Sequence, residues 1–176
     1  IIAFYRKGKH PRAQLHHNGL LWVDGTQRPA TWMGAVENGR PITPRTGYVV
    51  EINAYWYNAM CFATELLKAQ GKEHFAELME YQSELTRDAF VRTFWNGLYL
   101  NDYVVDGYQD KEVRPNQIWA VSLPYSPLDK RQQKAIVDIC TKELYTPKGL
   151  RTLSPKSGNY RPVYIGGQLE GERHLH

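Results

Sequence analysis

The sequence has few cysteines, no long apolar run and no large excess of charge of one sign. Its two cysteines, Cys61 and Cys140, are too few for a disulfide framework, and the apolar helical patterns around them favour free buried thiols over a bridge. The absence of such a framework favours a cytoplasmic protein. Uncharged stretches such as Ile52–Thr64 fall well short of the ~20 residues that a membrane span needs, so we expect no membrane partner.

The charge pattern and the histidine spacing argue against two further classes of function. Lys and Arg number 22 and Asp and Glu number 18, so the net charge is only +4, and no basic run alternates with aromatic residues. This argues against a nucleic-acid partner. The six histidines and two cysteines contain no set with zinc-ligand spacing, so we predict no metal and no cofactor.

The sequence does have an ample apolar fraction and many aromatic side chains. Hydrophobic residues make up 42% of it, which suits a folded core, and there are 12 Tyr and 5 Trp. Aromatic rings suit both sugar stacking and an ordinary core. The chain begins at Ile1 inside an apolar-aromatic pattern and ends at His176 without a helix stop signal, so we expect a piece of a longer protein.

Apolar residues at helical spacing predict a mostly helical chain with long loops. The expected helices span residues 48–70, 73–95, 115–123 and 126–144, the last with Ser126 as its N-cap. Residues 20–23 fit a short strand or turn, residues 98–105 fit a hairpin arm, and the rest of 1–47 and 145–176 reads as loop. Loops longer than ~12–15 residues inside a compact domain are usually functional, so we look for chemistry in them.

Three regions place Arg, Asn or Thr beside an aromatic residue or a proline at a helix end. The first comprises Ala30–Gly34, Pro41–Arg45 and Val50–Trp56, the second is Val113–Gln117 running into Ala120–Pro124, and the third is Thr146–Pro155. Sugar recognition needs flat aromatic faces for the C–H side of a ring and planar polar groups for adjacent hydroxyls. Each motif alone also fits a helix cap or a loop anchor, and the conjunction of three favours carbohydrate binding.

These segments resemble the C-terminal glucosidase domain of glycogen debranching enzymes, the amylo-α-1,6-glucosidase family. The likeness extends from His17 to Gly166, and its motifs are Thr31-Trp32-Met33, Pro41-Ile42-Thr43-Pro44-Arg45, Val50-Glu51-Ile52-Asn53-Ala54, Arg114-Pro115-Asn116-Gln117 and Gly149-Leu150-Arg151-Thr152-Leu153-Ser154-Pro155. The resemblance implies an all-α fold, an (α/α)6 toroid with long functional loops. With four visible helices, residues 1–176 would be about half of one such domain, and the remaining toroid sequence or self-association would have to cover the apolar helix faces.

The resemblance also implies an inverting α-1,6-glucosidase that acts on single-glucose stubs of glycogen or malto-oligosaccharides. Inversion needs a carboxylic acid and a carboxylate base ~6.5–9.5 Å apart. The family pattern has its acid after Thr-Trp-Met, and this chain has Gly34 there, which cannot donate a proton. The second carboxylate of the family lies beyond His176, and Gly171–His176 departs from the family pattern.

We therefore expect the chain to be incomplete or inactive as an enzyme. The alternative function is a non-catalytic carbohydrate-binding or interaction module on the same scaffold. Glu37 is a candidate substitute for the missing acid, although a solvated loop glutamate is the simpler interpretation of that residue. Asp102 and Asp106 flank a turn-like segment, and we explain both by turn chemistry.

The candidate substrate contacts are eight residues of the matching motifs: Trp32, Arg45, Glu51, Arg114, Asn116, Gln117, Arg151 and Thr152. Each candidate also has a structural explanation. Trp32 fits either a sugar platform or a core tryptophan. Glu51 fits a negative charge at a helix N-terminus, or a partner of Arg45 or of a sugar hydroxyl. The arginines also fit structural ion pairs, and Asn116 and Gln117 also fit the first turn of a helix. Trp56 lies on the apolar stripe of its helix, and we expect it in the core.

Overall fold

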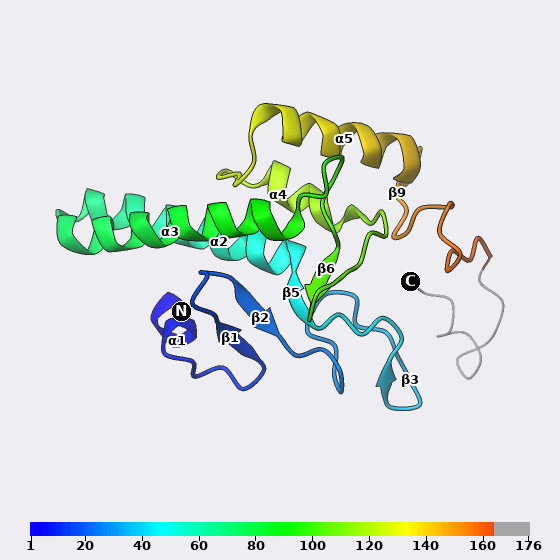
Figure 1. Cartoon of the computed structure of the whole chain (residues 1–176), viewed down its shortest axis with the longest axis horizontal. Helices are drawn as coiled ribbons and strands as arrows, with labels where there is room; N and C mark the ends of the chain where they lie inside the picture. Colours follow the sequence, from blue (N-terminus) through cyan, green and yellow to red (C-terminus); the bar gives the residue numbers. More distant parts are fainter. Residues whose placement is uncertain (164–176) are drawn as a thin grey trace.

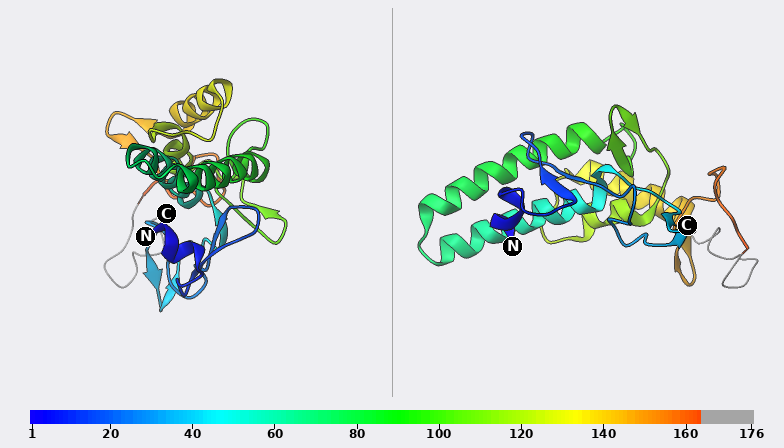
Figure 2. Two further views of the ribbon diagram at one scale, coloured as in Figure 1. Left: turned by 90° about the vertical axis from the view of Figure 1, so that its left-hand side faces the viewer. Right: turned by 90° about the horizontal axis from the view of Figure 1, so that it is seen from below.

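A long helical hairpin runs through the middle of the chain in a computed structural model that describes residues 1–163 (Figure 1). The hairpin consists of α2 (Val50–Ala69) and α3 (Glu73–Phe94), joined at Gly71, whose φ of 68° suits the tight turn. Helix α5 (Lys130–Leu144) lies on one side of it, and the short α1 (Ile2–Arg6) lies on the other (Figures 1 and 2).

The main core fills the space between the hairpin and α5. It joins apolar side chains that repeat at helical spacing in α2, α3 and α5, and the rings of Phe90 and Phe94 pack there with centroids 4.8 Å apart and planes tilted by 49°. Two short helical segments lie between α3 and α5 in the chain. They are the 3-10 turn η1 (Pro115–Ile118) and the four-residue α4 (Trp119–Ser122). Trp56 is 4% exposed, which confirms its expected place in the interior.

The expectation of an all-α chain forming part of an (α/α)6 toroid is wrong, because the described residues are a mixed α/β structure. They are 43% helical and 15% strand. An antiparallel sheet of five strands has the order β1-β2-β5-β6-β7. Its strands are β1 (Ala13–Leu15), β2 (Leu21–Val23), β5 (Gly47–Val49), β6 (Tyr103–Val105) and β7 (Tyr108–Gln109). Strands of two or three residues are too short for a recognisable alternation, so pairing across the fold defines them.

Two further ribbons lie outside this sheet. One is formed by β3 (Val36–Glu37) and β4 (Arg40–Pro41), and the other by β8 (Tyr145–Thr146) and β9 (Gly149–Leu150). Together with the sheet, they replace much of the loop expected at 1–47 and the first part of that expected at 145–176. Three expectations concern residues beyond 163 and lie outside the described residues. They are the last part of the expected loop, the end of the family likeness at Gly166, and the departure of Gly171–His176 from the family pattern.

The four predicted helices are confirmed with shifted ends. The first two begin or end within two residues of the expected bounds, and the third is η1 followed by α4. The fourth does not begin at Ser126. Its N-cap is Asp129, whose carboxylate accepts the N–H of Gln132 at 2.7 Å while the Gln132 side chain accepts the N–H of Asp129.

The expectations of free buried cysteines and of no membrane-spanning segment can be compared with the described residues. Cys61 and Cys140 are both free, and Cys140 is buried while Cys61 is half-buried. None of the helices within residues 1–163 combines the length and the apolar character needed to cross a membrane.

Candidate functional site

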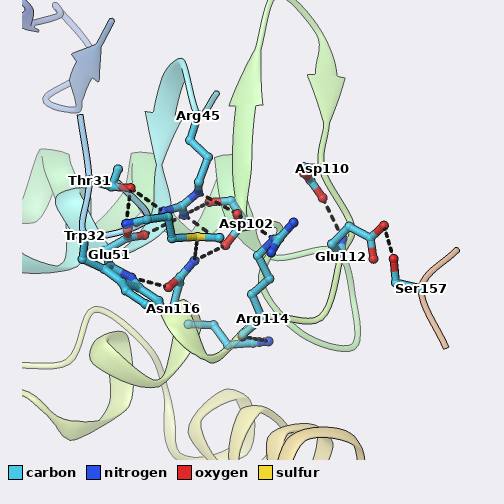
Figure 3. A network of polar contacts seen from close by, with 12 residues as sticks. Thr31, Trp32, Arg45, Glu51, Asp102, Asp110, Glu112, Arg114, Asn116 and Ser157 are labelled. Atoms are coloured by element: carbon cyan, nitrogen blue, oxygen red, sulfur yellow. Dashed lines mark hydrogen bonds and ion pairs between the residues drawn. The ribbon is translucent and has the colours of Figure 1, made fainter. Parts of the chain in front are cut away.

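Segments far apart in the sequence converge on one buried polar network beside the inner strands β5 and β6 (Figure 3). Arg45 comes from the loop before β5, Glu51 from the first turn of α2, Asp102 from the residue before β6, and Asn116 from η1. Strand β5 continues directly into α2, and the Val50 N–H donates to the Asp102 carbonyl at 3.1 Å. This backbone junction places both carboxylates next to the arginine.

Gly47 allows the strands of this junction to approach closely. Its φ is 105°, and a Cβ there would lie 2.3 Å from the Val104 carbonyl oxygen. A larger residue would therefore push β5 away from β6. Gly25 allows its own backbone to lie close to that of Arg45, because a Cβ at Gly25 would lie 2.4 Å from the Arg45 carbonyl oxygen.

Arg45 is the hub of the network and is only 2% exposed. Its two terminal nitrogens bind the two oxygens of Glu51, with a distance of 2.7 Å between Nη2 and Oε2. Its Nε lies 2.7 Å from Oδ2 of Asp102, as an ion pair that is not aligned as a hydrogen bond, and Nη2 donates to Oδ1 at 3.0 Å. The guanidinium thus holds two buried carboxylates at once, as its planar set of donors allows.

The ionised groups of this network balance in charge. Arg45 and Arg114 face Glu51 and Asp102, all of them less than 9% exposed. Burial raises the pKa of Glu51, and the Asp102 charge adds to this, while the hydrogen bonds from Arg45 act against it. Burial by itself lowers the pKa of Arg45, but Asp102 and Glu51 outweigh it and raise that pKa, so the arginine stays charged.

Asn116 connects this network to the surface. Its Nδ2 donates to Oδ1 of Asp102 at 2.7 Å, and its Oδ1 accepts the indole N–H of Trp32 at 2.8 Å. Asn116 is 1% exposed, whereas Trp32 is 53% exposed. The exposure excludes a core role for Trp32, and the ring lies in the loop between β2 and β3 with its N–H turned to the interior (Figure 3).

Arg114 contributes a buried cation whose donors are incompletely used. It is 6% exposed, and its Nε lies 3.5 Å from Oδ2 of Asp102. Neither its Nε nor its Nη1 has a hydrogen-bond partner within residues 1–163. The nearby Asp110 is also buried, which raises the pKa of its carboxyl group, and the Arg114 charge lowers it in part. A buried guanidinium N–H without a partner is costly, so part of the stabilising potential of Arg114 is unused.

Position 34 lies on the surface next to Trp32. Gly34 is exposed, and its N–H donates to the Trp32 carbonyl at 2.8 Å. Its φ is not in the region that requires glycine, and a Cβ there would lie 3.7 Å from the Trp32 carbonyl oxygen, which is ordinary van der Waals separation. The backbone therefore accepts an aspartate here. Glu37 is half-buried in β3, on the ribbon that follows.

The structure brings five of the eight candidate contacts together and leaves three apart. Trp32, Arg45, Glu51, Arg114 and Asn116 share the network described above. Gln117 instead accepts the Leu100 N–H and donates to the Arg114 carbonyl, so it supports the η1 backbone. Arg151 and Thr152 follow β9, and no hydrogen bond or ion pair given for residues 1–163 joins either to the network; Arg151 donates to the Tyr145 carbonyl at 3.4 Å.

Asp102 is the member of the network that sequence reasoning missed. We attributed it to turn chemistry, which holds for Asp106, whose φ of 47° lies at the turn between β6 and β7. Asp102 is instead 2% exposed and contacts Arg45, Arg114 and Asn116. One available signal was charge: three candidate arginines with only one candidate carboxylate imply a further buried carboxylate.

The residues that the structure describes offer no evident metal site, since none of their His, Cys, Asp and Glu side chains form a group of three placed to hold an ion. The network thus presents one exposed aromatic ring, that of Trp32, beside an amide and two carboxylates that are buried and bonded to one another and to Arg45.

Comparison with known proteins agrees with this geometry. The profile of the amylo-alpha-1,6-glucosidase family matches residues 1–176. The glycogen debranching enzyme of Saccharomyces cerevisiae is 28% identical over 191 aligned residues, which cover 85% of this chain and 12% of that protein. The chain thus spans about an eighth of the length of this relative. Because the family profile matches it from end to end, the chain belongs to the amylo-alpha-1,6-glucosidase family.

Proposed function

We propose that the chain provides the glucan-binding surface of a glycogen-debranching-type α-1,6-glucosidase. The observation that carries the proposal is the exposed indole of Trp32, whose N–H is held by the buried Asn116 at 2.8 Å. A ring held in this way presents a flat apolar face to the C–H side of a glucose unit.

The proposed reaction is hydrolysis of an α-1,6-linked glucose with inversion, and it needs an acid on one side of the sugar and a base on the other. Glu51 and Asp102 do not suit these roles, because both are buried and occupied by Arg45. Position 34 does suit the acid, since it is exposed and adjacent to Trp32. With glycine there, we expect the chain to bind glucan without cleaving it.

A second candidate function is a non-catalytic carbohydrate-binding module. The specific observation in its favour is Gly34, which leaves no carboxyl group at the position where the family pattern has one. The two candidates share the same sugar surface and differ in whether a longer polypeptide that contains this segment cleaves the bond.

The test is an assay of glucose release from a malto-oligosaccharide that carries one α-1,6-linked glucose. The 176-residue chain should release none, and neither should its Gly34→Asp variant, because one carboxylic acid without a base restores little. Loss of one such group typically costs ~10²–10⁴-fold in rate. In a longer polypeptide that contains the segment, Gly34→Asp should raise glucose release if the domain is catalytic and leave it at zero if it is a binding module.

Release of glucose by the unaltered 176-residue chain would contradict the proposal. It would place both catalytic carboxyl groups within this sequence, and Glu37 would then be the first residue to replace, since Glu51 is buried and paired with Arg45.

A further inference from the structure

The orientation of Trp32 depends on which way the Asn116 side chain faces. An asparagine amide has an oxygen that accepts and an NH2 group that donates, and both ends have nearly the same shape. An indole nitrogen can only donate, so the end that faces Trp32 must be the oxygen. The reversed amide would place two donors against each other at Trp32.

Asp102 sets this orientation from the other end of the amide. Its carboxylate only accepts when ionised, so it selects the NH2 group of Asn116, at 2.7 Å from Oδ1. The reversed amide would therefore also place two acceptors against each other at Asp102. Both ends of Asn116 favour the same orientation, and burial of the amide at 1% exposure keeps water from supplying a substitute partner.

Arg45 fixes Asp102 in turn. Its Nε and Nη2 lie 2.7 and 3.0 Å from the two carboxylate oxygens, and Nη2 also donates to the Asp102 carbonyl at 3.2 Å. The carboxylate is held at both its side chain and its backbone, so its Oδ1 cannot turn away from Asn116 without breaking an ion pair.

We infer that Asp102 and Asn116 are positioning residues, which act in series from the Arg45 hub to set the angle of the Trp32 ring against a bound α-glucan. The inference rests on the proposed function in one respect, namely that Trp32 contacts the sugar. Neither residue touches the substrate in this account. Their role is to lower the freedom of an exposed ring before the ligand arrives, which reduces the entropy lost on binding.

The first experiment measures the indole N–H of Trp32 by ¹H–¹⁵N NMR in the full chain. Its hydrogen exchange should be slow although the residue is 53% exposed, because the N–H is donated to a buried acceptor. In Asn116→Leu, which has a similar shape and no acceptor, exchange should accelerate at least about tenfold, as expected for loss of one hydrogen bond. In Asp102→Asn the new side chain can accept or donate, so only the Trp32 end still selects the orientation of Asn116, and the signal should broaden or double.

The second experiment measures the affinity for a malto-oligosaccharide that carries one α-1,6-linked glucose. Asn116→Leu should weaken the Kd about fivefold to tenfold. The matched control is Thr86→Val, which removes another buried side-chain hydrogen bond, from Oγ1 to the Gly19 carbonyl at 2.8 Å, and has no link to Trp32. This control should leave both the Trp32 exchange rate and the Kd unchanged, even if it lowers stability.

The outcomes separate this inference from the proposed function. Unchanged Trp32 exchange in Asn116→Leu would overturn the positioning role, whatever the affinity. Unchanged affinity in Asn116→Leu, together with loss of affinity in Trp32→Ala, would also overturn it and leave the proposed function standing. Unchanged affinity in Trp32→Ala would overturn the proposed function, and faster exchange in Asn116→Leu would then still support the orientation of Trp32 by Asn116.

Discussion

Arg45 connects stability and site geometry in a single side chain. It is 2% exposed and contacts both Glu51 and Asp102, so its removal would leave two carboxylates buried without their main counter-charge. The desolvation of unpaired buried charges makes such losses large, in the range of about 3–5 kcal/mol for a single buried pair. The same side chain holds Asp102 in place for Asn116, so folding and the proposed sugar surface depend on the same contacts.

The first prediction at this scale concerns Arg45→Lys. A lysine keeps the positive charge but has one ammonium group, which cannot bind both oxygens of Glu51 and reach Asp102 as well. We expect the free energy of unfolding to fall by about 2–4 kcal/mol, measured by urea denaturation followed by circular dichroism.

Arg87→Lys is the matched control, because Arg87 pairs with Asp88 on the surface, where both side chains are about half exposed. Exposed pairs contribute little, so this change should stay within about 0.5 kcal/mol. Equal stability of the Arg45→Lys protein and the unaltered chain would mean that the buried network does not hold the sheet to α2.

The residues of the network differ in how far the sequence predicts them. The pairing of Arg45 with Glu51 was one of the alternatives open from sequence, since the two residues are six positions apart and belong to two of the family motifs. The motif around Asn116 fits either a helix turn or a site role; the residue lies within η1, where it also joins Asp102 to Trp32, and a contact to substrate stays a prediction. Asp102 was not predictable from its neighbours, because burial by β6 and η1 is a property of the tertiary fold.

At the scale of elements, the end of α5 is held by a partly buried carboxylate. Glu143 accepts hydrogen bonds from Ser154 Oγ and Lys156 Nζ, each at 2.6 Å, and these two residues lie in the segment after β9. Burial raises the pKa of Glu143, but the hydrogen bonds from Lys156 and Ser154 outweigh it, so the pKa lies below its ordinary value of 4.5.

The second prediction follows from the sign of that shift. A carboxyl whose pKa is lowered on folding adds stability above its unfolded pKa and loses it as the pH falls through the folded pKa. Glu143→Gln should therefore lower the free energy of unfolding at neutral pH by about 1 kcal/mol, and the difference should shrink as the pH falls below 4.5. Urea denaturation between pH 7 and pH 3 measures it, and a difference that grows in acid would contradict the assignment.

The elements themselves were predictable in proportion to their length. Helices α2 and α3 have 20 and 22 residues, which gives the 3.6-residue repeat several turns to appear. The strands have two or three residues and were missed except at residues 20–23 and 98–105, where short strand or hairpin signals were visible. Helix α5 was placed three residues too early because Ser126 and Pro127 imitate a start, whereas Asp129 and Gln132 form the actual capping box.

At the scale of the whole molecule, the distal half of the α2–α3 hairpin exposes apolar side chains. The hairpin extends beyond the sheet and α5 (Figures 1 and 2). The exposed residues there are Phe62, Leu66, Phe75, Leu78 and Tyr81, at 45–69%. Contiguous apolar surface of this kind favours association.

The third prediction is that the isolated chain self-associates. Light scattering at increasing protein concentration should show a rising average mass, and replacement of Phe75 and Leu78 together by serine should reduce it, because both are exposed and contribute little to the core. A compact monomer at all concentrations would show that this surface needs no covering partner.

The most direct test of the central claim is a calorimetric titration with a malto-oligosaccharide that carries one α-1,6-linked glucose. The account predicts that the chain binds this ligand and that Trp32→Ala weakens the affinity at least about tenfold, or ~1.4 kcal/mol. Tyr108→Ala is the control, since Tyr108 is 57% exposed but lies on β7 and has no hydrogen bond to Asn116 or Arg45 within the described residues. It should leave the affinity unchanged. Affinity in Trp32→Ala within twofold of the unaltered chain would contradict a glucan-binding surface built on Trp32.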